Sequence, residues 1–392
     1  MSDLSPPIDP TPTDWGSEAI QRRIRKRYAA ERRFRLVGLG AVLLSAGFLA
    51  FLLVTMMANG LRGFSQTEVR IDLDSRAVAS VAAGDFEAAL GEESDLLSSS
   101  AWLRLRDSGV REGPVWLPAS TEVDVAAKGD GSRAAEHAHQ RLEAQDRVRT
   151  RLNLGFLTGS DATDPAQVGI WGAFKGSLLT MIVTLLLAFP VGVLSAVYLE
   201  EYAPRNRWTD MIEVSINNLA AVPSIIFGLL GLAVFLNTMH LPRSAPIVGG
   251  LTLALMTMPV IVIAGRNAIK SVPPSIRDAA LGIGASRIQV VFHHVLPLAL
   301  PGILTGTIIG MARALGETAP LLMIGMRAFI AAPPSGFTEP ATVLPVQIFL
   351  WSDEVSRGFV EKTSAAIIVL LVFLLAMNGL AIYLRNRFEK RW

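Results

Sequence analysis

Long apolar stretches constrain this chain more than any other feature of its sequence. A helix needs about 20 apolar residues to cross the hydrocarbon core of a bilayer. Stretches of about that length or longer occur at residues 36–57, 170–199, 211–236, 247–264, 297–326 and 365–384. Only 18% of the residues are charged, whereas a soluble domain usually carries about 25%. The sequence therefore predicts an all-α integral membrane protein with six transmembrane helices.

The basic residues predict the orientation of these helices. Residues 1–19 lack the apolar core of a signal peptide and are expected to form a disordered tail, and Arg and Lys then cluster up to residue 35. Basic residues favour the cytoplasmic side, so residues 1–35 are expected inside. The sixth helix then returns the chain to the inside, where residues 387–392 form a second basic tail. The predicted inner loops are richer in Arg and Lys than the outer loop at 237–246, which has only Arg243.

The segment at residues 59–168 separates the first helix (36–58) from a five-helix core (169–386). It is too long for a simple hairpin and mixes acidic and basic residues. Because long loops translocate regardless of charge, we expect it in the periplasm, as a small and partly ordered domain. Residues 132–152 predict a charged helix. His137 and His139 fall short of the four ligands of a structural zinc site, so we expect them to be surface residues.

The motifs of several catalytic classes are missing from the sequence. It contains no G-x-x-x-x-G-K-[ST] loop for ATP phosphates, no HExxH and no G-x-S-x-G. It has no cysteine, and its net charge of +2 gives no reason to expect nucleic-acid binding. We therefore expect no catalytic residues, metal or cofactor in this chain. If it transports a solute, it does so passively, coupled to an ion, or with ATP hydrolysed by another subunit.

The predicted inner loop at 266–297 contains a short helix with an apolar surface. Pro273 and Pro274 end the preceding element, and Ser275 is expected to cap a helix at 275–286, with Asp278 as its partner. Its apolar residues are Ala279, Ala280, Leu281 and Ile283, and Gly282 and Gly284 allow a sharp turn. An apolar helix on an inner loop indicates a docking site for a cytoplasmic protein. The alternative is a helix that lies on the lipid surface.

This loop resembles the EAA loop of the permeases of binding-protein-dependent ABC importers, E-A-A-x(3)-G-x(9)-I-x-L-P. The matching residues are Asp278-Ala279-Ala280, Gly284 and Leu296-Pro297, while Asp278 replaces Glu and His294 replaces Ile. In that family the loop sits in a groove of the ATPase subunit. The resemblance implies that the coupling residues are Arg277, Asp278, Ala279, Ala280 and Gly284.

Two further stretches are similar to phosphate permeases of the PstA family. They are NNLAAVPSIIFGLLGL at 217–232 and ARALGETAPLLMIG at 312–325. The similarity runs from about Trp171 to the C-terminus and includes the first helix, but it does not cover 59–168. It implies a multi-pass protein of the bacterial inner membrane, surrounded by lipid, that forms part of a pathway for inorganic phosphate.

The same resemblance implies partners. These are a homologous permease of the PstC type, PstB ATPases that bind ATP and Mg, and the periplasmic phosphate-binding protein PstS. One alternative is a permease for another oxyanion, such as sulfate, molybdate or phosphonate. A second is a membrane sensor or scaffold, although the EAA spacing argues against it.

Arg313 and Glu317 are the charged residues that stand out in the fifth apolar stretch. They are four residues apart and would share one face of a helix. Charges within a membrane usually face a pathway or each other, and the Arg fork matches phosphate oxygens. The pair is therefore either part of the substrate pathway or a structural ion pair.

The third apolar stretch is interrupted at Val222-Pro223-Ser224. A broken helix can direct N–H groups toward an anion, and Asn217, Asn218 and Ser224 could donate hydrogen bonds there. The alternative is a kink at which polar side chains join helices. Thr305 and Thr318 are weaker pathway candidates on the same basis.

Overall fold

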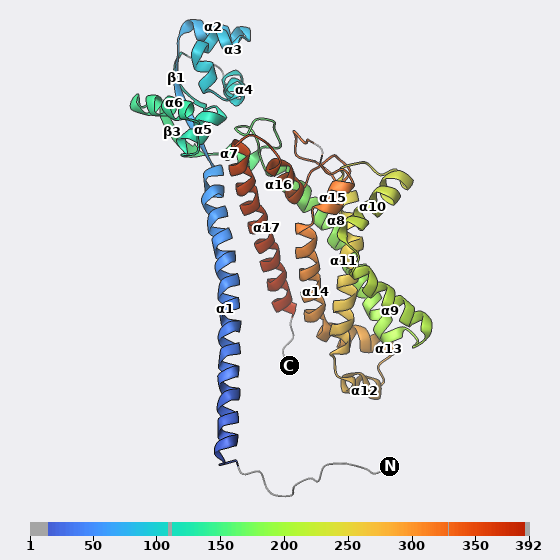
Figure 1. The fold of residues 1–392 in the computed structure, drawn as a ribbon. Helices are drawn as coiled ribbons and strands as arrows, with labels where there is room; N and C mark the ends of the chain where they lie inside the picture. The colour runs from blue at the N-terminus through green and yellow to red at the C-terminus, as the bar shows by residue number, and fades with distance from the viewer. Residues whose placement is uncertain (1–14, 109–111, 328, 389–392) are drawn as a thin grey trace, which may run out of the picture. The chain divides into compact units, whose positions relative to one another are not determined.

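The computed structural model describes residues 15–108, 112–327 and 329–388 (Figure 1). The chain divides into two compact units, and the boundary lies inside helix α1 between Thr55 and Met56. Each unit is therefore considered by itself.

The first unit consists mainly of α1 (Glu18–Gly63), which continues into the second unit. The apolar stretch predicted at 36–57 lies within this helix, which is long and apolar enough to cross a membrane. Helix α1 begins at Glu18, so the basic cluster within the tail predicted at 1–35 is helical. Arg35 pairs with Glu31 one turn earlier, which supports a helix there. Residues 1–14 lie outside the described part of the chain.

After the end of α1, the second unit contains a three-stranded antiparallel sheet, so the all-α prediction is wrong for the segment at 59–168. The sheet has the order β2-β1-β3. Its strands are β1 (Ser65–Leu73), β2 (Gly113–Pro118) and β3 (Val148–Leu152). Around it lie α2 (Ser75–Ala83), α3 (Phe86–Leu90), η1 (Gly91–Leu96), α4 (Ser99–Ser108), α5 (Thr121–Ala127) and α6 (Arg133–Ala144). We call this region the insertion.

The central strand β1 carries the core of the insertion. Val69, Ile71 and Leu73 are buried and pack against buried residues of the surrounding helices. Glu68 is also buried, and its carboxylate pairs with Arg104 at 2.8 Å and Arg149 at 2.6 Å. Burial of a carboxylate requires such partners. Both arginines therefore stabilise the fold of the insertion.

The helix predicted at 132–152 ends at Ala144. Asp146 adopts a positive φ of 54° and reverses the chain. Val148–Leu152 then forms β3, which pairs with β1 from Ser65 to Val69. Val148 and Thr150 alternate with arginines, and this period of two suits a strand rather than a helix. Tertiary pairing therefore decides the end of the helix.

The insertion is joined to the first turns of α17 (Gly358–Phe388) by buried charges. Lys128 Nζ donates to Glu361 Oε2 at 2.7 Å, to Asp124 Oδ2 at 2.8 Å and to the Ser65 carbonyl at 3.2 Å. Lys362 Nζ donates to the Gly63 carbonyl at the end of α1 at 2.9 Å. We call the four ionisable residues Asp124, Lys128, Glu361 and Lys362 the junction cluster.

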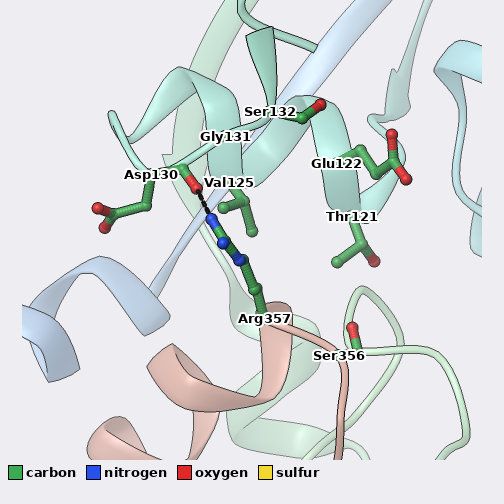
Figure 2. Close-up of a pocket in the computed structure, with 8 residues that line it drawn as sticks. All are labelled: Thr121, Glu122, Val125, Asp130, Gly131, Ser132, Ser356 and Arg357. Atoms are coloured by element: carbon green, nitrogen blue, oxygen red, sulfur yellow. Dashed lines mark hydrogen bonds between the residues drawn. The ribbon is translucent and has the colours of Figure 1, made fainter. Parts of the chain in front are cut away.

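A second contact between these regions lies beside the cluster. Arg357 Nη1 donates to the Asp130 carbonyl at 3.1 Å, where a cavity of about 530 Å³ opens (Figure 2). Figure 2 shows the carboxylates of Glu122 and Asp130 directed away from the guanidinium. The predicted periplasmic segment is thus a folded module with fixed contacts to α17.

The remaining helices follow the insertion and include further membrane-span candidates. They are α7 (Leu154–Thr158), α8 (Trp171–Val197) with the π-helical turn η2 (Tyr198–Tyr202), α9 (Arg207–Ala220), α10 (Ser224–Gly231) with η3 (Leu232–Thr238), α11 (Pro246–Lys270), α12 (Pro274–Gly282), α13 (Arg287–Gln289) with η4 (Val290–Val295), α14 (Leu296–Gly316), α15 (Ala319–Met323) and α16 (Leu344–Ser352). Among the described residues, five helices could each cross a membrane, or six spans exist if the bent pair α9–α10 counts as one.

Helix α11 lies at the centre of this bundle, against α8 and α14. Small residues allow the close approach, as is common between membrane helices. A Cβ at Gly250 of α11 would collide with Val183 of α8, and one at Gly306 of α14 would collide with Ala264 of α11. These two positions therefore require glycine.

Two of the predicted spans are broken. The third, predicted at 211–236, consists of α9 and α10, which meet at an angle of 100°. Pro223 lacks an N–H and disfavours a helical Val222, so the interruption is a sharp bend rather than a mild kink. The fifth, predicted at 297–326, ends its long helix at Gly316, where Glu317 takes an extended backbone.

Candidate functional site

Helix α12, on the loop that was predicted to face inside, is shorter than predicted and starts differently. It runs from Pro274 to Gly282, with Pro273 as its N-cap. Ser275 lies inside the helix, so its predicted capping role is wrong, and a proline at the first position supplies the start instead. The predicted turn is present, because Gly284 has a φ of +89°. A capping box of Ser286 and Gln289, which the sequence reading missed, then starts α13.

Arg277 fastens α12 to the rest of the bundle. Its guanidinium donates to Glu201 Oε1 at 2.6 Å and 3.1 Å, and to the carbonyls of Ile269 at 3.0 Å and Val272 at 2.7 Å. The carbonyls belong to the end of α11 and the residues after it, and Glu201 belongs to η2. A planar fork with this many acceptors is held in one place. Arg277 therefore positions the helix.

The apolar surface of α12 differs from the predicted one at Ala280. Ala280 is 4% exposed and packs inside this chain among Ile269, Val272, Val290 and Val291. Ile283, by contrast, is 83% exposed, and Leu281 and Ile288 are exposed as well. The helix periodicity turns Ala280 inward while the residues around the Gly284 turn point outward. Of the other predicted coupling residues, Asp278 and Ala279 are exposed.

Acidic residues on neighbouring helices complete the support of this loop. Arg266 of α11 pairs with Glu213 of α9 at 2.8 Å and with Glu200 of η2 at 3.2 Å. Lys270 lies 3.6 Å from the same Glu200. The sequence reading missed Glu200, Glu201 and Glu213. The sequence feature that could have indicated the first two is the Glu200-Glu201 pair at the end of the second apolar stretch. These acidic residues could have been matched with the basic residues at 266–277.

Arg313 and Glu317 are in contact, although not on one helix face. Arg313 lies in the last turn of α14, and Glu317 follows the end of the helix. Their closest atoms, Nε and Oε1, are 3.4 Å apart. The Arg313 side chain is 48% exposed and that of Glu317 is 21% exposed. The guanidinium is thus accessible and held by a single long contact among the described residues.

The polar residues of the third and fifth spans are only partly brought together. Asn217 and Asn218 are exposed on α9, before the bend, and Ser224 is the first residue of α10. Helix α10 packs closely on α15, which starts after Thr318 and Glu317. After the bend, α10 therefore packs against α15, the short helix that follows Arg313 and Glu317 in the chain.

Two of the weaker candidates have other contacts. Thr305 donates to the Pro301 carbonyl of its own helix and accepts from Arg385 of α17 at 3.4 Å, so it joins α14 to α17. In the insertion, His139 lies 3.7 Å from Glu143. The described ranges contain no group of three or more His, Asp or Glu side chains able to hold a metal ion.

Comparison with protein families gives two matches. Residues 172–391 match the family "Binding-protein-dependent transport system inner membrane component". Residues 21–90 match a domain of unknown function, DUF3333. The first match covers the whole bundle after the insertion, and the second covers most of α1 and the first part of the insertion.

Comparison with individual curated proteins agrees with the first match. The chain is 36% identical to the probable ABC transporter permease protein YqgI of Bacillus subtilis, over 48% of this chain and 63% of the relative. It is 30% identical to the phosphate transport system permease protein PstA of Haemophilus influenzae, over 58% of this chain and 79% of the relative. A structure of the MetNI methionine ABC transporter covers 57% of this chain and 95% of its own, with 17% identity and a TM-score of 0.44.

The chain spans 50% to 63% of the length of several of the curated relatives that it matches. The family model nevertheless covers more than half of the chain, and it covers every element from α8 to α17. The protein therefore belongs to the binding-protein-dependent transport system inner membrane component family, as a PstA-like ABC permease in a multi-pass membrane fold.

Proposed function

We propose that this chain is the transmembrane permease subunit of an ATP-driven importer for inorganic phosphate. The observation that carries the proposal is α12, a helix braced at Arg277 that presents exposed apolar residues beside the Gly284 turn. The substrate is proposed from the similarity to PstA proteins of several bacteria. The chain itself would bind no ATP, and a partner ATPase of the PstB type would hydrolyse it.

The ATPase would contact the outward side of α12. Ile283 and Leu281 supply apolar area, and Asp278 and Ala279 lie on exposed positions of the same helix. Arg277 and Ala280 would act indirectly, since they fix the helix against the bundle. A movement of the ATPase would then reach α11 through Arg277 and its carbonyl acceptors.

Phosphate would pass near Arg313. Its guanidinium is accessible, and its bond to Glu317 is long enough to be exchanged for a phosphate oxygen. Asn217, Asn218, Ser224 and Thr318 would contribute weaker polar contacts as the pathway changes shape. A homologous permease of the PstC type would form the other half of the pathway.

In this proposal both termini lie inside and the insertion lies outside. The insertion would be an accessory module that faces a PstS-type receptor, and the transport step would belong to residues 169–386. A cysteine at Glu143, which is exposed on α6, should react with an impermeant reagent added from outside. Labelling only after the cytoplasmic side is opened would reverse the topology.

The main experiment is reconstitution of the proposed complex with and without this chain. ATPase activity should rise with loaded phosphate receptor only when the chain is present. Sulfate, molybdate and phosphonate serve as competitors, and stimulation by one of them in place of phosphate would favour the other oxyanion importer.

The coupling surface has its own test. Ile283→Glu places a charge on the exposed apolar side of α12, which should abolish recovery of the ATPase in a pull-down. Leu152→Glu, at an exposed apolar position of β3, is the matched control and should leave ATPase recovery unchanged. Full ATPase recovery with Ile283→Glu would refute the docking role of α12 and favour a helix on the lipid surface.

A further inference from the structure

A second cavity, outside the proposed pathway, opens beside the start of α17. It measures about 300 Å³ and is formed by the loop after α7, the loop after α15 and helix α16. Its ionisable lining residues are Asp161, Arg327, Asp353 and Glu354. Three carboxylates and one guanidinium line the cavity, so it carries an excess of negative charge that favours a cation.

Gln347 supplies an independent sign of a ligand. Its side chain lines the cavity and the residue is 1% exposed. Neither Oε1 nor Nε2 makes a hydrogen bond of good geometry with the residues that the structure describes, although the amide lies close enough to Asp161 to lower the pKa of its carboxyl. A buried amide without partners is unfavourable. The two unused atoms therefore call for a group that can donate to Oε1 and accept from Nε2.

Asp161 is held in place on the wall of the same cavity. Trp351 Nε1 and the Ala162 backbone N–H both donate to its Oδ1 at 3.1 Å. Burial raises the pKa of the Asp161 carboxyl and the charge of Glu354 raises it further, although the hydrogen bond from Trp351 and the nearby Gln347 amide oppose the rise. The hydrogen-bond donors to this carboxyl are thus neutral groups.

The surroundings of the cavity are apolar and exposed. Phe329 of the lining and the neighbouring Phe349 are exposed, and Val355 in the loop before α17 is 98% exposed. The helix that follows, from Gly358, is a membrane-span candidate. An acidic cavity with an apolar rim at the end of a membrane helix suits the interface between headgroups and acyl chains.

We propose that this cavity binds the headgroup of a phosphatidylethanolamine-type lipid. Its primary ammonium donates to the Asp161 and Asp353 carboxylates and to Gln347 Oε1, and its phosphate accepts from Gln347 Nε2 and Arg327. A primary ammonium has three N–H donors, which a choline headgroup lacks. A metal ion is a poorer match, since the described residues hold no metal-binding group of three side chains.

The test measures lipid binding to the full chain by native mass spectrometry, with phosphatidylethanolamine and phosphatidylcholine of identical acyl chains. The unmodified chain should bind phosphatidylethanolamine at least about tenfold more tightly, the change expected from one hydrogen bond to a charged group. Gln347→Leu should lose this preference, while its thermal midpoint stays the same or rises because an unpaired amide has been removed.

A second variant keeps the test valid if Gln347→Leu does not fold. Asp353→Asn combined with Glu354→Gln changes only exposed positions and should also lose the preference. Glu122→Gln, a carboxylate of the cavity in Figure 2, is the control and should retain it.

Equal binding of the two lipids would overturn the proposal, as would full preference in both cavity variants. Binding of soluble phosphoethanolamine without binding of the lipid would identify a free amine as the ligand instead. A photo-crosslinker at Phe329 should capture lipid in membranes, and capture of a protein alone would make the cavity a docking point for a basic side chain.

Discussion

Two cations of the second unit are held in opposite ways. Lys128 in the junction cluster contacts three oxygens within 3.2 Å and is almost fully buried. Arg313 makes one contact of 3.4 Å and is about half exposed. A buried cation with fixed partners cannot exchange them without a large loss of stability. A half-exposed cation with one weak partner can exchange that partner at little cost. This difference separates a structural charge from one that is available to a substrate.

The sharpest way to break this comparison is to remove Lys128. Lys128→Met leaves Glu361 and Asp124 buried without their cation, which should lower the free energy of unfolding by about 3–5 kcal/mol. Thermal unfolding of the purified chain, followed by size-exclusion chromatography, measures the loss. Lys128→Met with Glu361→Gln should recover part of it, because one uncompensated charge is gone. If the single variant is as stable as the unmodified chain, the junction cluster is not what fixes the insertion.

Arg277, in the proposed coupling loop, is a second firmly held cation, because like Lys128 it donates to several acceptors. Arg277→Gln removes the bonds to Glu201 and two carbonyls, and the loss should allow α12 to move. We expect ATPase association to weaken by at least about tenfold. Arg277→Lys keeps the charge without the fork and should recover only part of the affinity. Normal ATPase association in both variants would show that α12 is held by its apolar contacts alone.

Arg313 is the test of the loosely held cation. Arg313→Gln should reduce phosphate uptake about tenfold, as expected for the loss of one charge-assisted contact. The stability of the chain should change by less than about 1 kcal/mol, because an exposed pair contributes little. Uptake by the assembled complex and thermal unfolding are measured on the same preparation.

The double variant Arg313→Gln with Glu317→Gln then separates the two interpretations of the pair. A structural pair predicts recovery of uptake, since no unpaired charge remains. A pathway role predicts continued loss. Recovery in a fully assembled complex would remove Arg313 from the pathway.

The smallest expected effect concerns a firmly held anion, Asp164, on the loop that joins the insertion to α8. Ser98, Ser99, Thr121 and the Ala166 N–H donate to its carboxylate. Burial raises the pKa of this carboxyl, but the hydrogen bonds outweigh burial and the net pKa is lowered. Its stabilisation is therefore complete above the unfolded-state pKa and is lost as pH falls through the folded-state pKa.

Asp164→Asn should therefore be about 1 kcal/mol less stable than the unmodified chain at neutral pH. The difference should shrink below about pH 4. Denaturant unfolding at neutral and acidic pH measures it, and a difference that does not depend on pH would contradict the proposed role of the ionised carboxyl.

The sequence predicted the helical membrane bundle well, because long apolar runs report directly on the bilayer. It was less successful where polar and apolar residues are mixed. The helix predicted at 132–152 was wrong after Ala144, since strand pairing with β1 outweighed a weak helical pattern. Ala280 was also misassigned to the exposed side of α12, because nothing in the local sequence shows that it faces Val290 and Val291.

By itself, the sequence determined the apolar spans, the break at Pro223 and the turn at Gly284, since each depends on local backbone chemistry. Only the tertiary structure decided which charges are fixed and which are free. Lys128 and Glu361 are 233 residues apart, and Arg277 and Glu201 are 76 apart, so no local pattern connects them. Arg313 and Glu317 look in the sequence like a firm helical pair, yet α14 ends between them. A charge acquires its role from the partners and the burial that the fold gives it, and those are long-range properties.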